Sequence, residues 1–187
     1  MKIKNISYKK LNLLGCYLIT PKLYKDGRGS FQEIYNEKNF YKITGIKHSF
    51  KQNNISVSNK NVLRGLHFQL NKPQAKHITV IKGKILDIAV DLRKNSSTFT
   101  KVFTLELTDK NCKSIYIPAG FAHGFLTLGK ENIIHYSCTE YRSIGNEYSL
   151  SYKDPALKIK LPVKKLIVAS KDANAKNLDQ LIKLKVI

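Results

Sequence analysis

The stretch "NVLRGLHFQ", residues 61–69, places an arginine and a histidine in a run that otherwise has the composition of a β-strand. Histidine accepts and donates protons near neutral pH, and the planar guanidinium of arginine binds anionic groups such as phosphate. Arg64 and His67 are three positions apart, so a regular strand would turn them to opposite sides. Both can reach one pocket only if the strand is distorted, and Gly65 is the position at which a β-bulge could do this.

Lys76 lies in a second run, "AKHITVIK", in which two-residue alternation puts it on the same side as Ile78 and Val80. If that side faces the core, an ammonium group projects into an apolar interior. The alternative is that Lys76 lies at the entrance of the strand and extends its amine into solvent. Alternation alone leaves both readings open.

A tyrosine and a further histidine mark two more positions. In "ENIIHYSCTEY", Ile134, Tyr136 and Cys138 share one face. The Tyr136 hydroxyl would therefore point inward, and His135 would face the other way. In "IPAGFAHGF", one proline and two glycines predict a turn that could aim His123 into the mouth of a barrel. Taken singly, each residue has an ordinary structural explanation, since a buried tyrosine usually packs with its hydroxyl hydrogen-bonded.

The elements that would position these side chains are β-strands. Apolar and polar residues alternate in two runs in the middle of the chain, and the apolar residues of each run share one face: Leu86, Ile88, Val90 and Leu92, then Phe103, Leu105 and Leu107. Gly83 and the polar stretch "RKNSS" separate short strands without a helical pattern between them. This spacing predicts antiparallel strands in a sandwich or barrel.

Two peripheral segments have helical patterns. "NEKNFYKITG" can begin with Asn36 as its N-cap and end at Gly45. "DANAKNLDQLIKLK", within residues 172–185, has Leu178, Leu181 and Ile182 at helical spacing. The sequence therefore predicts an all-β protein with a few short helices.

Length and composition limit the class of protein. The chain has 187 residues and no Pro-, Gly- or Ser-rich stretch that would divide it, which predicts one domain over residues 1–187. The amino-terminal segment lacks the apolar core of a signal peptide, and no stretch approaches the roughly 18 apolar residues of a membrane span. We therefore expect a cytoplasmic protein that makes no membrane contact. Cys16, Cys112 and Cys138 are widely spaced, which predicts free thiols, mostly buried.

The formal net charge of +20 could indicate a nucleic-acid partner, because dense Lys and Arg surfaces bind phosphate through counterion release. The basic residues, however, are spread from Lys2 to Lys185, and only four of the 33 are arginine. A lysine-rich surface that favours solubility explains the charge, and we expect no nucleic-acid partner.

Three long motifs in order, "VLRGLHFQ", "KPQAKHITVIKGKILDIAVDLRKNSSTFTK" and "IPAGFAHGFLTL", resemble those of nucleotide-sugar 3,5-epimerases of the dTDP-4-dehydrorhamnose 3,5-epimerase type. The resemblance implies a cupin-type, jelly-roll β-barrel that is usually a homodimer. It also implies inversion of C3, C5 or both in a nucleotide-linked 4-keto-6-deoxy sugar, without a cofactor. The product would serve deoxysugar synthesis for a surface polysaccharide.

Such a reaction needs a base, an acid on the opposite side of the sugar, and a cation or donor where the enolate oxygen forms. By resemblance, His67 is the base and Asp172, in "ASKD", is its partner, which would fix the tautomer and stabilise the imidazolium. Tyr136 matches the proton donor on the opposite side. Lys76 matches the lysine whose charge stabilises the developing oxyanion.

Further positions match the nucleotide-sugar-binding residues of the family: Arg28, Gln52, Asn54, Arg64, His123 and Glu147. Arginine suits a diphosphate because its planar fork donates to two oxygens at once. The chain departs from the family at Leu161, which replaces a tryptophan, and it has no tryptophan at all. Tyr24 and Phe31 could supply aromatic surface near the substrate.

Three alternatives stay open at this point. A metal-dependent cupin would use "PAGFAH" as a P-x-G-x-x-H motif, but His67 and His123 supply only two clear ligands, so we expect no metal. A C3-epimerase or a 3,4-ketoisomerase would also begin by forming an enolate toward C3. A non-catalytic nucleotide-sugar-binding cupin would have no need of an acid opposite the base. Pocket shape decides between nucleotides and between hexose and heptose, and the motifs leave these choices open.

Overall fold

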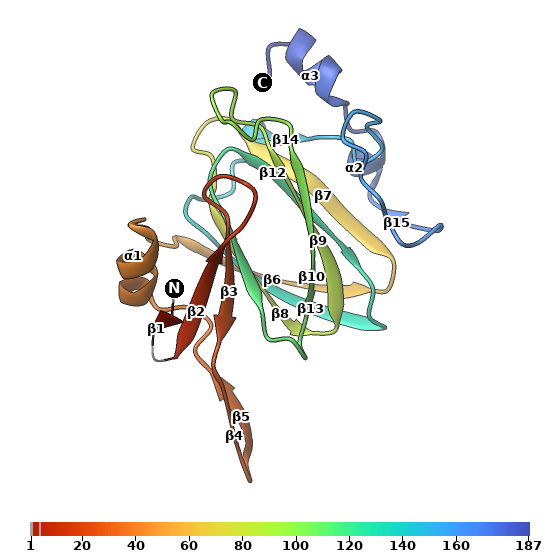
Figure 1. The fold of residues 1–187 in the computed structure, drawn as a ribbon. Coiled ribbons are helices and arrows are strands. Elements are labelled where there is room, and N and C mark those ends of the chain that lie inside the picture. Colours follow the sequence, from red (N-terminus) through yellow and green to blue (C-terminus); the bar gives the residue numbers. More distant parts are fainter. Residues whose placement is uncertain (1, 4) are drawn as a thin grey trace.

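Two β-sheets face each other and form a barrel in the computed structural model of the protein, which describes residues 2, 3 and 5–187 (Figure 1). This arrangement confirms the predicted all-β, cupin-type jelly-roll barrel with few helices. The seven-stranded sheet has the spatial order β1 (Lys2–Ile3), β2 (Ile6–Lys10), β3 (Tyr17–Pro21), β11 (Ser114–Ile117), β8 (Lys76–Lys82), β13 (Glu131–Cys138) and β6 (Gln52–Asn59). The six-stranded sheet has the order β10 (Val102–Thr108), β9 (Lys84–Asp91), β12 (Phe121–Thr127), β7 (Val62–Gln69) and β14 (Glu147–Ser149), with β15 (Ile167–Val168) parallel to β7.

The barrel interior is built from the inward side chains of both sheets. Ile78 and Ile134 of the seven-stranded sheet and Phe125 of the six-stranded sheet belong to one buried apolar cluster. The outward residues Ile88 and Val90 of β9 pack in a second cluster, against the carboxyl-terminal segment. The alternation predicted for residues 86–92 is therefore confirmed, because the two faces of β9 contribute to different cores.

The helix α1 (Glu37–Thr44) covers the outer face of the seven-stranded sheet. The Asn36 side chain accepts a hydrogen bond from the backbone N–H of Asn39 at 3.1 Å, and Gly45 ends the helix with φ at 71°. Both predicted caps are confirmed, since Asn is a favoured N-cap and glycine adopts the left-handed conformation without strain. Phe40 is 1% exposed and packs against Tyr116, which joins the helix to the sheet.

The carboxyl-terminal segment differs from the predicted helix within residues 172–185. It forms two short helices, α2 (Ser170–Ala173) and α3 (Leu178–Lys183), because the Asn177 side chain accepts the backbone N–H of Gln180 at 2.8 Å and starts α3 anew. Leu178 and Leu181 are buried against the outer face of the six-stranded sheet, as their spacing predicted, whereas Ile182 is 43% exposed and does not join that face.

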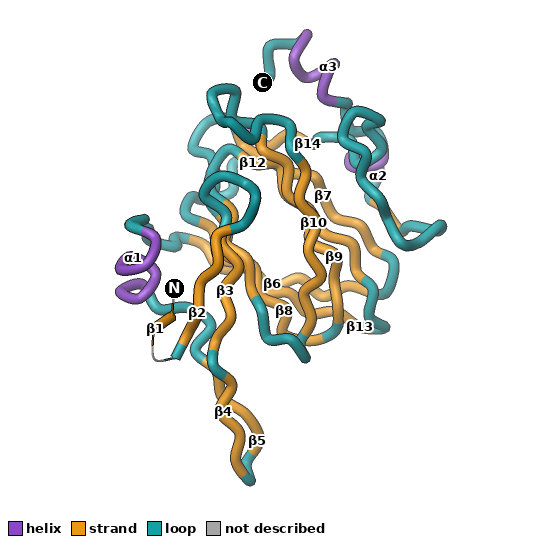
Figure 2. The backbone as a smooth tube through the Cα atoms, viewed as in Figure 1, coloured by secondary structure: helices purple, strands orange, loops and turns teal. Residues whose placement is uncertain are grey.

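The hairpin of β4 (Leu23–Asp26) and β5 (Gly29–Gln32) projects from the barrel, as Figures 1 and 2 show. Arg28 lies in its turn, with 91% of its side chain exposed, and forms an ion pair with Asp26 (Nη2 to Oδ2, 2.5 Å). Phe31 is 69% exposed and Tyr24 is 38% exposed. The hairpin therefore presents an arginine and two aromatic rings outside the barrel.

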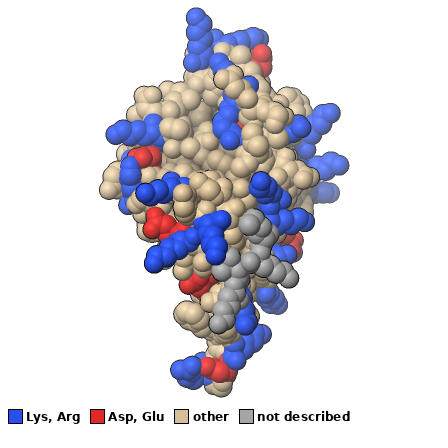
Figure 3. All heavy atoms as spheres, turned by 60° about the vertical axis from the view of Figure 1, so that its left-hand side comes forward, with Lys and Arg blue, Asp and Glu red and all other residues tan. Residues whose placement is uncertain are grey.

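The distribution of basic side chains and the state of the three cysteines agree with what the sequence predicts. Lys and Arg side chains are scattered over the face seen in Figure 3 and do not form one stripe. The three cysteines are free: Cys16 and Cys138 are buried, and Cys112 is partly exposed. In the described part of the chain, residues 2, 3 and 5–187, no helix has the length and apolar character needed to cross a membrane.

Candidate active site

A β-bulge at Gly65 turns Arg64 and His67 to the same side of β7. His67 pairs with His123 of β12 and Arg64 pairs with Phe125, so two residues of β7 lie opposite one residue of β12. His123 and Phe125 are two positions apart and share the inner face, which places both of their partners there as well. Gly65 has a φ of +117°, and a Cβ atom on it would lie 2.6 Å from the backbone of β12. The predicted distortion is confirmed.

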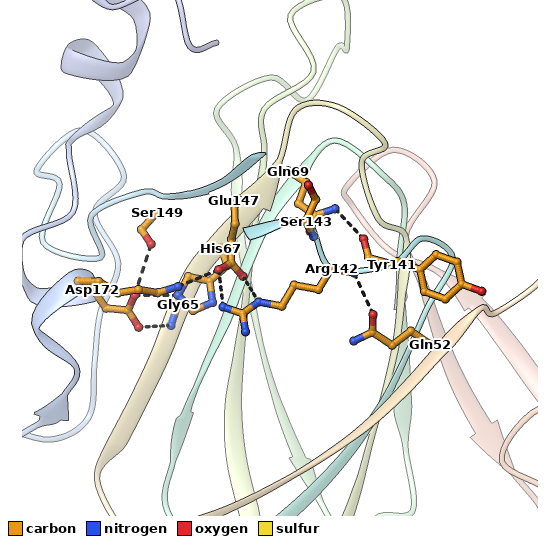
Figure 4. A network of polar contacts seen from close by, with 11 residues as sticks. Gln52, Gly65, His67, Gln69, Tyr141, Arg142, Ser143, Glu147, Ser149 and Asp172 are labelled. Atoms are coloured by element: carbon orange, nitrogen blue, oxygen red, sulfur yellow. Dashed lines mark hydrogen bonds and ion pairs between the residues drawn. The ribbon is translucent and has the colours of Figure 1, made fainter. Parts of the chain in front are cut away.

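His67 is hydrogen-bonded to Asp172 of α2, as Figure 4 shows. The Nε2 atom lies 2.7 Å from Oδ1 of Asp172, which is 3% exposed and also accepts the backbone N–H of Gly65 at 3.1 Å. Burial alone would raise the pKa of Asp172, but the hydrogen bonds that the carboxylate accepts and the nearby positive charges, those of His67 first, together outweigh burial and hold the pKa below its usual value. An ionised carboxylate accepts Nε2–H, so Nδ1 is the ring nitrogen that can take a proton.

Lys76 points into the barrel from the first position of β8. It shares its face with Ile78 and Val80, which belong to the interior cluster, so the inward reading of the sequence is the correct one. Together with His67 and Glu147 it lines a pocket at the mouth of the barrel. Burial lowers the pKa of the Lys76 amine.

Tyr136 approaches this region from the opposite sheet. It lies on β13, pairs with Asn54 of β6 and packs against the interior cluster, so its predicted inward direction is confirmed. Burial raises the pKa of Tyr136, while the positive charges of Arg64 and Arg142 act against that rise. Because His67 and Tyr136 belong to facing sheets, a ligand between them would have one of these side chains on each side.

Glu147 holds two cations at the rim of the pocket, and Figure 4 shows the first of them, Arg142. The Oε2 atom of Glu147 lies 2.8 Å from Nη2 of Arg142 and 2.9 Å from Nζ of Lys171. Burial would raise the pKa of Glu147, but the hydrogen bonds from these two residues lower it to about 2. Sequence reasoning missed both cations. Lys171 directly precedes Asp172, which could have marked it, whereas the fold alone brings Arg142 here.

Gln52 and Asn54 of β6 join the same network from the edge of the seven-stranded sheet. The Gln52 side chain donates to Oδ1 of Asn54 at 2.8 Å and accepts the backbone N–H of Arg142 at 2.9 Å. Arg64 donates to Oγ of Ser58 at 3.1 Å. The structure therefore brings these three predicted binding residues to the wall and rim of the barrel.

His123 lies within β12 and not in the turn where the sequence pattern placed it. The turn closes at Gly120, and the strand begins at Phe121, so the imidazole is 8% exposed inside the barrel. Its Nε2 atom lies 2.8 Å from Oδ2 of Asp87. The position in the turn was wrong, but the predicted direction into the barrel is correct.

The structure does not bring three of the predicted binding residues to His67 within one chain. Arg28, Tyr24 and Phe31 lie on the projecting β4–β5 hairpin (Figure 1). Leu161, at the position of the missing tryptophan, packs against the apolar clusters of the carboxyl-terminal segment. Leu161 therefore provides no aromatic ring on which the base of a nucleotide could stack.

Whether the barrel could hold a metal depends on which groups the ring nitrogens of its two inner histidines contact. Each directs its Nε2 atom to a carboxylate, His67 to Asp172 and His123 to Asp87. Across residues 2, 3 and 5–187, no cluster of three or more His, Cys, Asp or Glu side chains is placed to hold a metal ion. That the protein works without a metal or cofactor remains a prediction.

Comparisons with known proteins identify the family. The family model described as dTDP-4-dehydrorhamnose 3,5-epimerase matches residues 10–180. The dTDP-4-dehydrorhamnose 3,5-epimerase of Methanothermobacter thermautotrophicus is 45% identical over 172 residues, which cover 90% of this chain and 92% of that protein.

Two solved structures have the same fold. A dTDP-6-deoxy-D-glucose-3,5-epimerase from Legionella pneumophila, in complex with dTDP-4-keto-L-rhamnose, is 37% identical with a TM-score of 0.93 and 97% of each chain covered. ChmJ, a 3'-monoepimerase from Streptomyces bikiniensis in complex with dTDP-quinovose, is 28% identical with a TM-score of 0.88, covering 95% of this chain and 90% of that one. The protein therefore belongs to the dTDP-4-dehydrorhamnose 3,5-epimerase family.

Proposed function

We propose that this protein is an epimerase that inverts C3 and C5 of a dTDP-linked 4-keto-6-deoxy sugar. The observation that carries the proposal is the placement of His67, paired with Asp172, on one sheet and Tyr136 on the facing sheet. Inversion requires proton removal on one face of the sugar and proton delivery on the other, which two facing groups can perform. The family membership supports the same reaction class.

The proposed steps need only these side chains. Nδ1 of His67 takes the C3 proton, the C–H electron pair forms the C3–C4 double bond, and the C4 oxygen becomes an enolate oxygen. The Lys76 ammonium lies in the same pocket and stabilises that oxygen. The Tyr136 hydroxyl then delivers a proton to the opposite face of C3, and the ketone forms again. Exchange with solvent returns the lost proton to Tyr136 and removes the one on His67, and C5 follows the same sequence.

The direct test is deuterium incorporation by the wild-type protein. Incubated in D₂O with a dTDP-4-keto-6-deoxy hexose, the protein should introduce deuterium at C3 and C5, read by mass spectrometry and proton NMR. Label at C3 alone would favour the second candidate, a C3-epimerase, which the likeness to ChmJ supports. A product whose ketone has moved from C4 to C3 would indicate a 3,4-ketoisomerase. Binding without any label would contradict the enzyme and leave a nucleotide-sugar-binding cupin. The same assay with GDP-linked and heptose substrates tests the choice of nucleotide and sugar.

The Tyr136→Phe variant should separate proton exchange from inversion. His67 can still remove a proton and return one to the same face, so deuterium should still enter C3 with the original configuration. Inversion should fall about 100-fold, because the acid on the other face is gone. The matched control is Tyr148→Phe, since the Tyr148 ring stacks on Phe68 in the apolar cluster outside the barrel. Inversion at the wild-type rate in Tyr136→Phe would exclude Tyr136 as the acid.

We infer that the nucleotide diphosphate lies along the rim of the barrel. Arg64, Gln52 and Asn54 face this region, and Glu147 holds Arg142 and Lys171 beside it. A diphosphate brings negative charge that guanidinium and ammonium groups bind strongly. His123, which lines the interior, would bind the sugar.

A homodimer would account for the residues on the projecting hairpin. Within one chain, Arg28, Tyr24 and Phe31 lie away from His67, so we propose that they reach the site of a second copy. The surface that would pair is the outer face of the seven-stranded sheet, where Ile55 and Val57 are 67% and 61% exposed. The side chains paired with or next to them on β6 and β13 are uncharged: Asn53, Ile133, His135 and Ser137. On β8, Lys82 lies opposite Ile133 and forms an ion pair with Glu131, which balances its charge. A neutral face allows association in a chain of net charge +20.

The double variant Ile55→Lys, Val57→Lys should therefore be monomeric. Two added charges on each copy would meet across a two-fold interface and repel. Analytical ultracentrifugation should give twice the mass of the chain for the wild type and a single mass for the variant. Ile167→Lys is the control, because Ile167 is 59% exposed on the other sheet and should leave the dimer intact. A wild-type protein that sediments as one chain would refute the dimer.

The wider setting is also proposed from the family. We propose that the whole chain acts as one domain in the cytoplasm and that its product enters deoxysugar synthesis for a surface polysaccharide. The two sheets enclose one interior cluster, which supports a single unit. Complementation of a host strain that lacks this epimerase, read as restored surface polysaccharide, tests the assignment.

A further inference from the structure

The chain crosses from the seven-stranded sheet to the six-stranded sheet between β13 and β14, at the rim of the pocket. Residues 140–143 of this crossing, which we call the rim segment, lie outside the helices and strands. Across residues 2, 3 and 5–187, no backbone–backbone hydrogen bond involves Glu140, Tyr141 or Arg142. A segment without such bonds moves unless side chains hold it. The rim segment carries Arg142, so what holds it matters for the site.

Gln69, the last residue of the motif "VLRGLHFQ", binds the rim segment from β7. Its Nε2 atom donates to the carbonyl oxygen of Tyr141 at 3.3 Å and to that of Lys72 at 3.2 Å. Its Oε1 atom accepts the backbone N–H of Ser143 at 2.9 Å. Gln69 is 6% exposed and lines the pocket with His67. Both hydrogens of its amide group therefore bind backbone oxygens, and the proposed steps leave this side chain without a role.

Two further glutamines bind the remaining residues of the rim segment. Gln74, in the connection between β7 and β8, donates from Nε2 to the carbonyl oxygen of Glu140 at 2.8 Å. Gln52 of β6 accepts the backbone N–H of Arg142 at 2.9 Å. Figure 4 shows Gln52 and Gln69 approaching the segment from different strands. Glutamine amides from three separate parts of the chain therefore hold all four residues of the segment.

Arg142 is fixed at both of its ends by this arrangement. Its backbone is held by Gln52, and its guanidinium donates to the Glu147 carboxylate from Nε at 3.3 Å and from Nη2 at 2.8 Å. Glu147 lies directly opposite Gln69 in the pairing of β14 with β7 and lines the same pocket. A cation that is already ordered binds an anion at a smaller entropic cost than a cation on a mobile segment.

We propose that Gln69 and Gln74 are positioning residues, which hold the rim segment so that Arg142 is already ordered when the nucleotide of the substrate arrives. The proposal rests on the proposed function, because the nucleotide sugar is the anion that reaches the rim. Neither glutamine transfers a proton. Both act through the backbone of residues 140–143.

The first test measures the rim segment without any ligand. Amide hydrogen exchange, followed by NMR, should show protection of the Arg142 and Ser143 amides in the wild type. The variant Gln69→Met keeps the approximate length of the side chain and removes its hydrogen bonds. Both amides should then exchange about 10-fold faster, because one loses its acceptor and the segment opens as a unit.

The matched control is Asn111→Leu. The Asn111 side chain also binds three backbone groups, which are the N–H groups of Thr108 and Lys113 and the carbonyl oxygen of Glu106. Its turn follows β10, whose last residue pairs with the first residue of β9, whereas the pocket residue Phe121 pairs with the last residue of β9. Asn111 therefore lies at the other end of the barrel, and its loss should leave the rim amides and the binding of dTDP unchanged.

The second test measures dTDP binding by calorimetry and turnover by the epimerase assay. Gln69→Met should bind dTDP about 10-fold more weakly and raise KM by a similar factor, because Arg142 must then be ordered during binding. The value of kcat should stay within about two-fold of the wild type, since the rim segment does not hold His67 or Tyr136. Gln74→Met removes one bond and should weaken binding about 3-fold. A merely structural glutamine would lower stability without this split between KM and kcat.

A double-mutant cycle tests whether Gln69 acts through Arg142. Arg142→Met alone should weaken dTDP binding, because a cation at the rim is lost. In that background, Gln69→Met should weaken binding no further, since the side chain that it positions is gone. Losses that multiply would mean that Gln69 affects the ligand by another route, which would overturn the inference.

The outcomes separate this inference from the proposed function. Wild-type protein that introduces no deuterium refutes the function, while amide exchange and dTDP binding still test the glutamines. Unchanged amide exchange in Gln69→Met, or wild-type affinity for dTDP, contradicts the inference whatever the activity. If Gln69→Met does not fold, Gln74→Met takes its place in both tests. Wild-type Arg142 and Ser143 amides that exchange as fast as those of an unfolded peptide would show that the glutamines do not hold the segment.

Discussion

The His67→Ala variant is expected to lose catalysis while keeping its ligand. Both deuterium incorporation and inversion at C3 and C5 should slow by about 1000-fold, because removal of a general base costs roughly 10² to 10⁴ in rate and here both centres depend on the same imidazole. Binding of dTDP, measured by calorimetry, should match that of the wild type, since the cations at the rim of the barrel remain in place.

The control for this variant is His48→Ala. His48 contacts the Tyr116 hydroxyl on the outer face of the seven-stranded sheet, so its loss should leave proton exchange intact. Asp172→Asn should show a smaller loss than His67→Ala, because the base remains but its tautomer is no longer held. If His67→Ala still introduces deuterium at the wild-type rate, another group is the base.

The Gly65→Ala variant is expected to destabilise the fold by about 3 kcal/mol or more. An added Cβ atom would lie 2.6 Å from Cα of Gly124 and 2.7 Å from the carbonyl oxygen of His123, and the residue has a φ of +117°. Backbone atoms of a paired strand cannot move aside without a loss of stability, and L-residues other than glycine rarely adopt that φ. Chemical denaturation at constant pH measures the loss. Activity should fall as well, since the bulge aligns Arg64 with His67.

Gly145→Ala is the matched control for the Gly65→Ala variant. Gly145 lies in the short 3₁₀ helix at Ile144–Asn146, and a Cβ atom there would meet nothing within 4 Å. Its free energy of unfolding should stay within about 0.5 kcal/mol of the wild type. Equal stability of the Gly65→Ala protein and the wild type would show that β7 can pair with β12 without the bulge.

Local periodicity predicted which way many side chains of the site point. Alternation placed Tyr136 on an inward face, and the structure agrees because every residue of a paired strand must follow the pleat. For Lys76 alternation left two readings, and the apolar cluster around Ile78 decides for the inward one. The distortion at Gly65 followed from requiring two residues of opposite parity in one pocket.

The remaining features depend on contacts between distant segments. Arg142 and Lys171 meet at Glu147 because two chain segments converge at the rim, and no period in either segment encodes that meeting. Asp87 has the opposite parity to the predicted apolar run of its strand, so that run did not mark it, and only the fold shows that it lies inside the barrel beside His123. The break before α3 arises from the cap at Asn177, which competes with the continuous apolar spacing.

The distance in sequence between His67 and Asp172 has a consequence for protein synthesis. The two residues are 105 positions apart, and every strand that lines the pocket is translated before Asp172. Protein chains fold from the amino terminus as they leave the ribosome. A nascent chain can therefore close its barrel around an imidazole that still lacks its carboxylate. His67 gains its carboxylate only when β15 pairs with β7 and α2 packs against the same strand, so maturation of activity follows closure of the barrel in time.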